Sequence, residues 1–397
     1  MMYRYRVTLD EALPAEREQD LRSRVFFVDE AINDFSLSVG DEGINEVTLM
    51  TGTPVDESEL GRKLRRLVEG QLRDMRTVPA GQVWRSSHPA HPRPDVFEDL
   101  VESGAVAELG EGQFCLDQSF LTLMDYLDGR LREIVRRRLH GREYRYPTLL
   151  SVDTLRRAGY LSSFPQFLMF VTRLHGDVDT YSAFLNEERG SADGVRDPLR
   201  FCDNSDYCLP PTMCFHTYHQ WSGKAVPSMV VTARGKSFRF ESRYRRSLER
   251  LWDFTIREVV FLGDRDHVLS CRETLMNTVF ELLTELGMAG TCELANDLFF
   301  SDSETSPQTI SQRMLALKYE LRLPVAPDRT VAAGSFNFHE RLFTDSFDIR
   351  HVDGIPAYTG CAGFGLERLA YAFLCQHGVT PKGWPPPVRE HHERARV

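Results

Sequence analysis

Lysine is scarce in this 397-residue sequence, and the few that occur are scattered: Lys63, Lys224, Lys236, Lys318 and Lys382. The other basic residues are arginines, so no catalytic lysine is indicated. No apolar run approaches the roughly 18–20 residues that span a bilayer, and the N-terminal MMYRYRVTLDEALPAERE lacks the pattern of a signal peptide. We therefore expect a cytoplasmic protein with no membrane partner.

A general basic character is also missing, because the formal net charge is −10. General nucleic-acid binders usually carry a basic footprint, so this balance argues against that class while leaving room for a local basic patch. The hydrophobic content of 42% and charged content of 27% are typical of a soluble globular protein. The length allows two domains, or one large domain with an appendage.

The cysteines form no CxxC pair, and we expect no disulfide framework in a cytosolic chain of this length. Most of them should be buried thiols, and a few could be metal ligands or nucleophiles. The eight cysteines are Cys115, Cys202, Cys208, Cys214, Cys271, Cys292, Cys361 and Cys375.

Residues 1–80 are predicted to form a small α/β module. YRYRVTL alternates like a strand, residues 14–32 have helical periodicity, and DFSLSVG and INEVTLM are strand-like segments separated by the turn signal GDEG. ESELGRKLRRLVEGQLRDM is a strongly amphipathic helix, and QVWRS is a candidate last strand. This order fits a ferredoxin-like module. It contains no recognisable motif, so a docking module and a structural cap both remain open.

The residue composition changes after about residue 80, and the proline-rich HPAHPRP lies near the start of the second part, residues 81–397. FLTLMDYLDGRLREIVRRRL and ETLMNTVFELLTELG are predicted helices. Strand-like segments are MVVTARG, FRFESRY, LWDFTIREVVFLG, ALKYELRLPV and FDIRHVDGIPAYTGC. Because strands outnumber alternating strand–helix units, we expect an α+β fold with an antiparallel sheet flanked by helices.

The first candidate site lies in FRFESRYRRSLERLWDFTIRE, which runs from residue 238 to residue 258. On an extended strand, Arg239 and Glu241 would face the same side. Arg250 opens the next segment and Phe254 follows it. Arginines beside a carboxylate and an aromatic ring suit a nucleotide, since arginines neutralise phosphates and a ring can stack on a base. Taken alone, a charged hairpin that faces water explains the pattern somewhat better.

The second candidate site is GFGLERLAYAF, from residue 363 to residue 373. Glycines on a strand allow a flat ligand to approach the backbone, and Arg368 falls in the first turn of the following helix. An ordinary strand-to-helix turn is the alternative. In combination, the two stretches resemble motifs 2 and 3 of the class II aminoacyl-tRNA synthetases. The long helix ending in RYPTLL, with Pro147, resembles motif 1, which forms the dimer interface in that family. The resemblance covers about residues 107–375.

The resemblance implies roles for individual residues. Arg239 would contact the α-phosphate of ATP, Glu241 would bind the adenine amino group, Phe254 would stack on adenine, and Arg368 would hold the γ-phosphate, with Arg250 also at the ATP site. An amino-acid carboxylate would attack the α-phosphorus and give an aminoacyl adenylate. Such sites work by positioning and charge stabilisation, with Mg²⁺ bridging the phosphates.

Within the class, the sequence resembles the zinc-dependent seryl-tRNA synthetases of methanogens and their truncated relatives, the amino acid:carrier protein ligases. Both hold a zinc ion in the amino-acid pocket with Cys, Glu and Cys, which implies Cys214, Glu258 and Cys361 here. Each alone could be a buried thiol or a salt-bridge partner. The lower-ranked rival ligands are His216, His219, Cys202 and Cys208. Three protein ligands would leave one position for the substrate amine.

AAGSFNFHERLF resembles the substrate-pocket segment of the ligases, which implies Asn337, His339 and Glu340 as pocket residues. Glu320 and Glu340 could bind Mg²⁺ or substrate, or could equally be exposed strand charges. Residues 297–313, DLFFSDSETSPQTISQR, occupy the interval that contacts the carrier in the ligases, with a loose match.

Three functions remain open at this stage. The favoured one is ATP-dependent activation of a small amino acid and its transfer to the phosphopantetheine thiol of a carrier protein, by a homodimer. A zinc-type aminoacyl-tRNA synthetase is the alternative, and tRNA is the less expected partner because only about 80 residues precede the catalytic region. A catalytically silent scaffold ranks last, because Arg239, Arg250 and Arg368 are all present.

Overall fold

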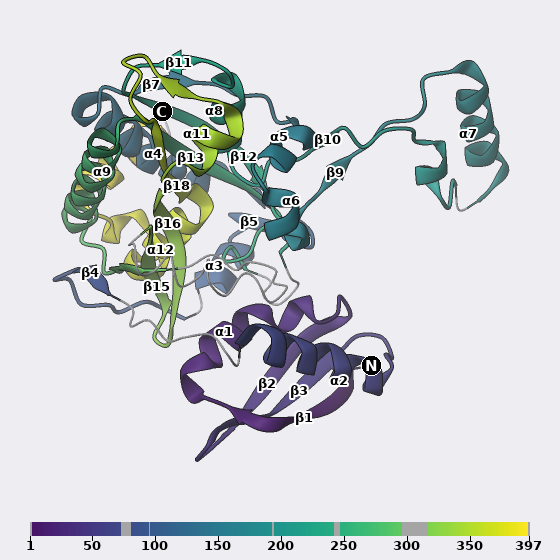
Figure 1. The fold of residues 1–397 in the computed structure, drawn as a ribbon. Coiled ribbons are helices and arrows are strands. Elements are labelled where there is room, and N and C mark those ends of the chain that lie inside the picture. The colour runs from purple at the N-terminus through teal and green to yellow at the C-terminus, as the bar shows by residue number, and fades with distance from the viewer. Residues whose placement is uncertain are drawn as a thin grey trace.

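The computed structural model describes residues 2–72, 81–94, 96–192, 194–241, 247–295 and 317–395. Its central feature is an eight-stranded sheet in the order β4-β14-β15-β16-β18-β13-β12-β7 (Figure 1). All neighbours pair antiparallel except β12 and β7. The strands are β4 Gln82–Arg85, β7 Arg142–Tyr144, β12 Met229–Phe238, β13 Asp253–Gly263, β14 Thr291–Leu294, β15 Lys318–Ala326, β16 Arg329–Phe338 and β18 Tyr358–Gly365.

One face of the sheet packs against long helices. The predicted helix of motif 1 is α4, whose apolar positions recur at helical spacing and are buried, and the Asp117 side chain caps it by accepting from the Phe120 N–H. Val259 and Phe261 of β13 join this core. The helices on this side are α4 Gln118–Arg138, α9 Arg265–Glu285 and α12 Leu366–His377, and α13 Pro386–Arg394 packs on α4.

The other face carries a second core. Val260 and Leu262 of β13 point to it, because side chains alternate along a strand. Cys361 of β18 belongs to the same core. Short elements contribute to this side: β8 Leu150–Ser151, α5 Val152–Arg157, α6 Tyr160–Ser163, β10 Tyr207–Cys208, α8 Cys214–Gln220, β11 Ala225–Val226 and α11 Leu342–Phe347. Two cores on opposite faces of an antiparallel sheet confirm the predicted α+β class.

The N-terminal residues form a separate three-stranded sheet in the order β1-β3-β2, with a hydrophobic core of its own. At the predicted turn between β2 and β3, Gly43 adopts a φ of 122°, which residues with a side chain rarely adopt. The elements are β1 Tyr3–Leu13, η1 Ala15–Arg17, α1 Glu18–Arg24, η2 Val25–Phe27, β2 Ile32–Gly40, β3 Gly43–Thr51, α2 Glu57–Leu67 and η3 Val68–Leu72.

The predicted last strand of this module, QVWRS, is instead β4 at the edge of the large sheet, where it pairs with β14. The Trp84 ring stacks on Phe280 of α9, with 4.6 Å between ring centroids, so burial of this ring holds the strand on the large sheet. The ferredoxin-like order of six elements was therefore wrong in its last member. Strand propensity alone could not tell which sheet β4 would join.

A projecting arm was not predicted. β9 Phe170–Val171 and β10 lead away from the body to α7 Val178–Gly190 (Figure 1), and no α7 side chain that the structure describes is buried. The remaining elements are α3 Val96–Glu102, β5 Val106–Gly110, β6 Gln113–Leu116, η4 Pro165–Phe167, η5 Pro198–Phe201, β17 Arg350–His351 and η6 Pro381–Gly383. Within the described ranges, every helix is too short or too polar to cross a bilayer.

Candidate active site

Three side chains with metal-binding atoms meet on the α8 side of the sheet. Cys214 is the first residue of α8, Glu258 lies in the middle of β13, and Cys361 lies in β18. Their two sulfurs and one carboxylate oxygen all lie within 4.8 Å of one another, and all three residues are buried. β13 and β18 are antiparallel neighbours in which Val260 pairs with Cys361 and Glu258 pairs with Gly363. Glu258 and Cys361 therefore share one face.

Burial sets the protonation of this cluster. It raises the pKa of Glu258 to about 7. A hydrogen bond of 2.5 Å from the Thr212 hydroxyl to the carboxylate acts in the opposite direction and lowers this pKa. A hydrogen bond with Cys214, burial and the nearby Glu258 raise the pKa of the Cys361 thiol well above its ordinary value. Two sulfurs and a carboxylate are a donor set that suits Zn²⁺, which would displace these protons.

The glycines of motif 3 have a local explanation. A Cβ atom at Gly363 would lie 2.9 Å from Ile256 Cδ1 and 3.5 Å from each carboxylate oxygen of Glu258. Glycine at this position therefore leaves room for the Glu258 carboxylate to lie flat over the neighbouring strand. Glu367, the acid of the same motif, is buried and accepts a hydrogen bond from the Thr255 N–H at 2.8 Å. It ties the start of α12 to β13.

The predicted pocket residues divide into two groups. Asn337 Nδ2 donates to the Cys361 sulfur at 3.4 Å, and His339 Nε2 lies 3.7 Å from the same sulfur. The structure thus brings Asn337 and His339 next to the cluster of Cys214, Glu258 and Cys361. In the part of the chain that the structure describes, that cluster includes neither Glu320 nor Glu340.

Those two carboxylates have arginine or lysine neighbours instead. Glu320 lies 3.2 Å from the Lys318 amine and 3.3 Å from Arg322, and its charge also acts on Arg250 and Arg368. The Glu340 carboxylate lies 3.9 Å from Arg265. Only Glu320 is therefore associated with the second half of the site.

The second half of the site is a buried carboxylate surrounded by arginines. Arg250 Nη1 donates to Glu241 Oε2 at a distance of 2.5 Å, and Arg368 Nη2 lies 3.4 Å from Glu241 Oε1. Burial would raise the pKa of Glu241, but Arg250, Arg368 and Arg239 outweigh it and lower the pKa to about 2. One fully ionised carboxylate among three guanidinium groups leaves surplus positive charge, which suits phosphate groups.

Arg239 lies between this half and the metal cluster. Its positive charge lowers the pKa values of both Glu241 and Glu258. Its Nε atom donates to the Pro211 carbonyl at 3.0 Å, and its guanidinium carbon lies 5.5 Å from the centre of the Phe254 ring. The five residues predicted for the ATP site are therefore brought together.

The expected strand geometry of Arg239 and Glu241 was wrong. β12 ends at Phe238, and the Glu241 N–H donates to the Arg239 carbonyl at 2.7 Å, which is a tight turn rather than an extended strand. The Arg239 charge acts on Glu241, so the two side chains are near each other across this turn and not through alternation along a strand.

The rival metal ligands have other partners. His216 Nε2 lies 3.4 Å from the Leu149 carbonyl, and His219 Nδ1 lies 3.1 Å from the Thr154 hydroxyl. The sulfurs of Cys202 and Cys208 donate to the carbonyls of Pro198 and Leu150. Within the described residues, none of the four belongs to the metal-binding group.

Three residues of this region had no sequence signal. Thr212 orients Glu258, and Tyr218 is fully buried, with a pKa raised by burial and by the Cys214 thiol. Arg257 points from β13 to the opposite face, where its guanidinium pairs with Asp128 of α4 at 2.7 Å and with Glu143 of β7 at 3.0 Å. An arginine in the middle of an apolar strand could have suggested a buried ion pair, but its partners could not be read from the sequence.

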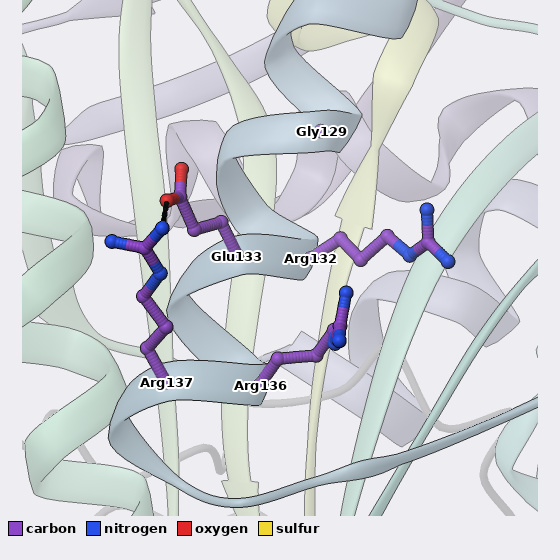
Figure 2. Close-up of a pocket in the computed structure, with 5 residues that line it drawn as sticks. All are labelled: Gly129, Arg132, Glu133, Arg136 and Arg137. Atoms are coloured by element: carbon purple, nitrogen blue, oxygen red, sulfur yellow. Dashed lines mark ion pairs between the residues drawn. The ribbon is translucent and has the colours of Figure 1, made fainter.

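A cavity of about 400 Å³ on α4 shares no residue with this site. It is lined by Gly129, Arg132, Glu133, Arg136 and Arg137. Arg137 pairs with Glu133 at 2.8 Å, while Arg132 and Arg136 extend to the other side of the helix (Figure 2). The cavity lies on the helix that resembles motif 1.

Comparisons with known proteins identify two groups of relatives. The chain is 32% identical over 252 residues to amino acid–acyl-carrier-protein ligase 2 of Bradyrhizobium diazoefficiens, which covers 62% of this chain and 73% of that protein. It is 26% identical over 320 residues to the type-2 serine–tRNA ligase of Methanopyrus kandleri, which covers 75% of this chain and 59% of that protein. No protein-family model matches the chain.

Among solved structures, the fold resembles that of M. kandleri SerRS in a complex with A. aeolicus tRNASec. The TM-score is 0.72 at 22% identity, over 99% of this chain and 78% of that chain. The likeness confirms the predicted fold, an antiparallel synthetase-type sheet with flanking helices.

Proposed function

Because the chain belongs to the family of amino acid–acyl-carrier-protein ligases, we propose that it activates a small amino acid with ATP and transfers it to the phosphopantetheine thiol of a carrier protein. One observation carries the proposal: the charge of Arg239 acts both on Glu258 of the Cys214, Glu258 and Cys361 cluster and on Glu241 of the arginine group. A site for an amino group and a site for phosphates are thereby adjacent.

The reaction has two steps. In the first, an oxygen of the amino-acid carboxylate attacks the α-phosphorus of ATP, the bond from that phosphorus to the bridging oxygen breaks, and pyrophosphate leaves. In the second, the carrier thiol attacks the carbonyl carbon of the adenylate, AMP leaves with the electrons of the C–O bond, and the thiol proton passes to solvent. Both steps depend on positioning and on stabilising negative charge.

Arginine side chains supply that stabilisation. Arg239, between the two halves, neutralises the α-phosphate and the charge that develops on it. Arg368 and Arg250 hold the outer phosphates. Mg²⁺, when bound, would supply further positive charge there, and Glu320 is a candidate to hold it. Glu241 accepts from the adenine amino group and Phe254 offers a ring face to the base. Because Glu241 is ionised, it can only accept hydrogen bonds, which suits an exocyclic amine.

The buried cluster selects the amino acid. A zinc ion held by Cys214, Glu258 and Cys361 would supply an open coordination position for the unprotonated α-amine. Beside it, Asn337 donates to the Cys361 sulfur, and we propose that the Asn337 side chain limits the substrate side chain to a small one.

We also propose the division of the chain into a module of residues 1–80 and a catalytic domain of residues 81–397, since the N-terminal sheet has its own core. The proposed homodimer would be formed along α4. The segment predicted to contact the carrier, 297–313, lies outside the described residues. A cytoplasmic location fits because the reaction consumes ATP.

Exchange of labelled pyrophosphate into ATP tests the first step. The assay runs over a panel of amino acids, with and without a zinc chelator, and exchange with one or a few small amino acids is expected. A second assay offers the activated amino acid to a phosphopantetheinylated carrier and to total tRNA. Label in a thiol-sensitive bond to the carrier supports the proposal, whereas label in tRNA favours the synthetase alternative. Silence across the whole panel would indicate a scaffold.

A further inference from the structure

A short series of polar contacts leads from a buried tyrosine to one ligand of the cluster. We infer that Tyr218 and His339 form a hydrogen-bonded chain that ends on the Cys361 sulfur and holds it in the position that binds a metal ion. His339 is then a positioning residue that acts on a ligand, not a group that touches the substrate. The inference rests on the metal site of the proposed function.

The contacts are continuous across three elements. The Tyr218 hydroxyl of α8 lies 3.3 Å from His339 Nδ1, just after β16, and His339 Nε2 lies 3.7 Å from the Cys361 sulfur of β18. Asn337 Nδ2 adds a second donor to that sulfur at 3.4 Å. Glu258 also has an outer partner, because the Thr212 hydroxyl donates to its carboxylate at 2.5 Å.

The chemistry of the groups fixes the direction of the chain. A thiolate that ligates a metal has no proton and can only accept, so the imidazole must carry its proton on Nε2. In the neutral ring, Nδ1 is then an acceptor. The Tyr218 phenol keeps its proton at neutral pH and donates to Nδ1. Tyr218 therefore selects the tautomer of His339 that supports the thiolate.

Packing makes the chain rigid. The Tyr218 ring is stacked on Phe343, with 4.5 Å between centroids and 20° between planes, and the His339 ring meets the same phenylalanine edge-on at 4.8 Å. The His339 N–H also donates to the Thr359 carbonyl at 2.9 Å, which fixes the histidine backbone to β18. Tyr218 is completely buried. The Tyr218 ring cannot swing away without opening the second core.

Outer partners of metal ligands typically contribute 10–100-fold to metal affinity. We therefore expect His339→Ala to weaken zinc binding by about that factor. His339→Gln should recover part of the loss, because its amide nitrogen can donate to the sulfur. Tyr218→Phe keeps the stacked ring and removes only the hydroxyl, so a smaller loss of several-fold is expected.

The test measures zinc affinity of the full-length protein by competition with a chromophoric chelator. A second readout is the sulfur-to-metal charge-transfer band of the Co²⁺-substituted protein, which reports the environment of the thiolates without any turnover. His216→Ala is the matched control: this imidazole is also buried on α8, but it contacts the Leu149 carbonyl and stacks on Tyr146. The control should bind zinc within about twofold of the unmodified protein.

Equal zinc affinities for His339→Ala and His216→Ala would overturn the inference, and so would an unchanged charge-transfer band in both His339 variants. Should His339→Ala fail to fold, Tyr218→Phe becomes the decisive variant, because it conserves the packing of the ring. If this variant binds zinc as tightly as the unmodified protein, the proposed hydrogen-bonded chain from Tyr218 to Cys361 is rejected. If the unmodified protein binds zinc and the variants lose it while no carrier or amino acid is used, the proposed function falls and this inference stands.

Discussion

Replacing Cys361 by alanine removes one of the three proposed metal ligands and little else. The sulfur is buried, and its close contacts are the other cluster members and the side chains of Asn337 and His339. Alanine occupies less volume than cysteine, so the β18 backbone can keep its pairing with β13 and β16. The substitution should therefore affect the metal site far more than the fold.

The size of the effect follows from the small number of ligands. Zinc binding by four protein ligands is worth roughly 10–16 kcal/mol, or about 2.5–4 kcal/mol for each ligand if shared evenly. At 1.4 kcal/mol for each factor of ten, loss of one thiolate weakens zinc binding by about 10²–10³-fold. Because the metal is proposed to hold the substrate amine, pyrophosphate exchange should fall with the metal content.

Metal content after gel filtration and the exchange rate are measured on the same preparations. Cys208→Ala provides the matched control, since this thiol is also buried on the α8 side but donates to the Leu150 carbonyl outside the cluster. The control should retain both zinc and exchange. A Cys361→Ala protein that keeps stoichiometric zinc and full exchange would refute the metal role of this site.

Three further predictions concern the surroundings of the site. Arg257→Met should destabilise the protein in urea unfolding by at most about 3–5 kcal/mol, because it removes the buried partner of Asp128 and leaves that carboxylate only Arg234, at 3.5 Å. Adding Asp128→Asn should restore part of the loss, and equal stability of the single and unmodified proteins would contradict the buried ion pair. The folded-state pKa of Glu241 is about 2 against an ordinary value of 4.5, so the ionised carboxylate stabilises the fold above about pH 4.5, and this stabilisation is lost as the pH falls towards 2. Glu241→Gln should therefore lose less stability on acidification than the unmodified protein. Parallel curves of stability against pH for the two proteins would count against the arginine cluster. Arg136→Glu on the α4 cavity should weaken the proposed dimer in sedimentation velocity, whereas an unchanged mass would remove α4 from the interface.

Sequence reasoning was most successful where periodicity or a motif specified one arrangement. The apolar positions of α4 predicted the long helix, and the glycines before Arg368 predicted the strand-to-helix turn, in which β18 ends at Gly365 and α12 begins at Leu366. Cys214, Glu258 and Cys361 were named only through the resemblance to zinc-dependent relatives. They are far apart in the chain, and no spacing rule could have joined them.

The two wrong strand predictions share a cause: each segment is compatible with more than one local structure, and its tertiary contacts determine which one forms. QVWRS reads as a strand in either sheet, and the burial of Trp84 against Phe280 decides its place. FRFESRY reads as a strand throughout, yet the chain turns after Phe238 so that Glu241 can be buried among arginines. A buried carboxylate needs its partners in place, and that requirement overrides strand propensity.

Arg239 shows why this departure from the strand matters for chemistry. A residue within β12 would be fixed by the register with β13, whereas Arg239 lies just beyond the last pair, Phe238 with Asp253. From there its charge acts on Glu258 in one half of the site and on Glu241 in the other. A substrate carboxylate bound beside Glu258 and an ATP phosphate bound beside Glu241 would meet at the Arg239 guanidinium group, where the new oxygen–phosphorus bond has to form. The turn after β12 thus places one cation beside both halves of the proposed site.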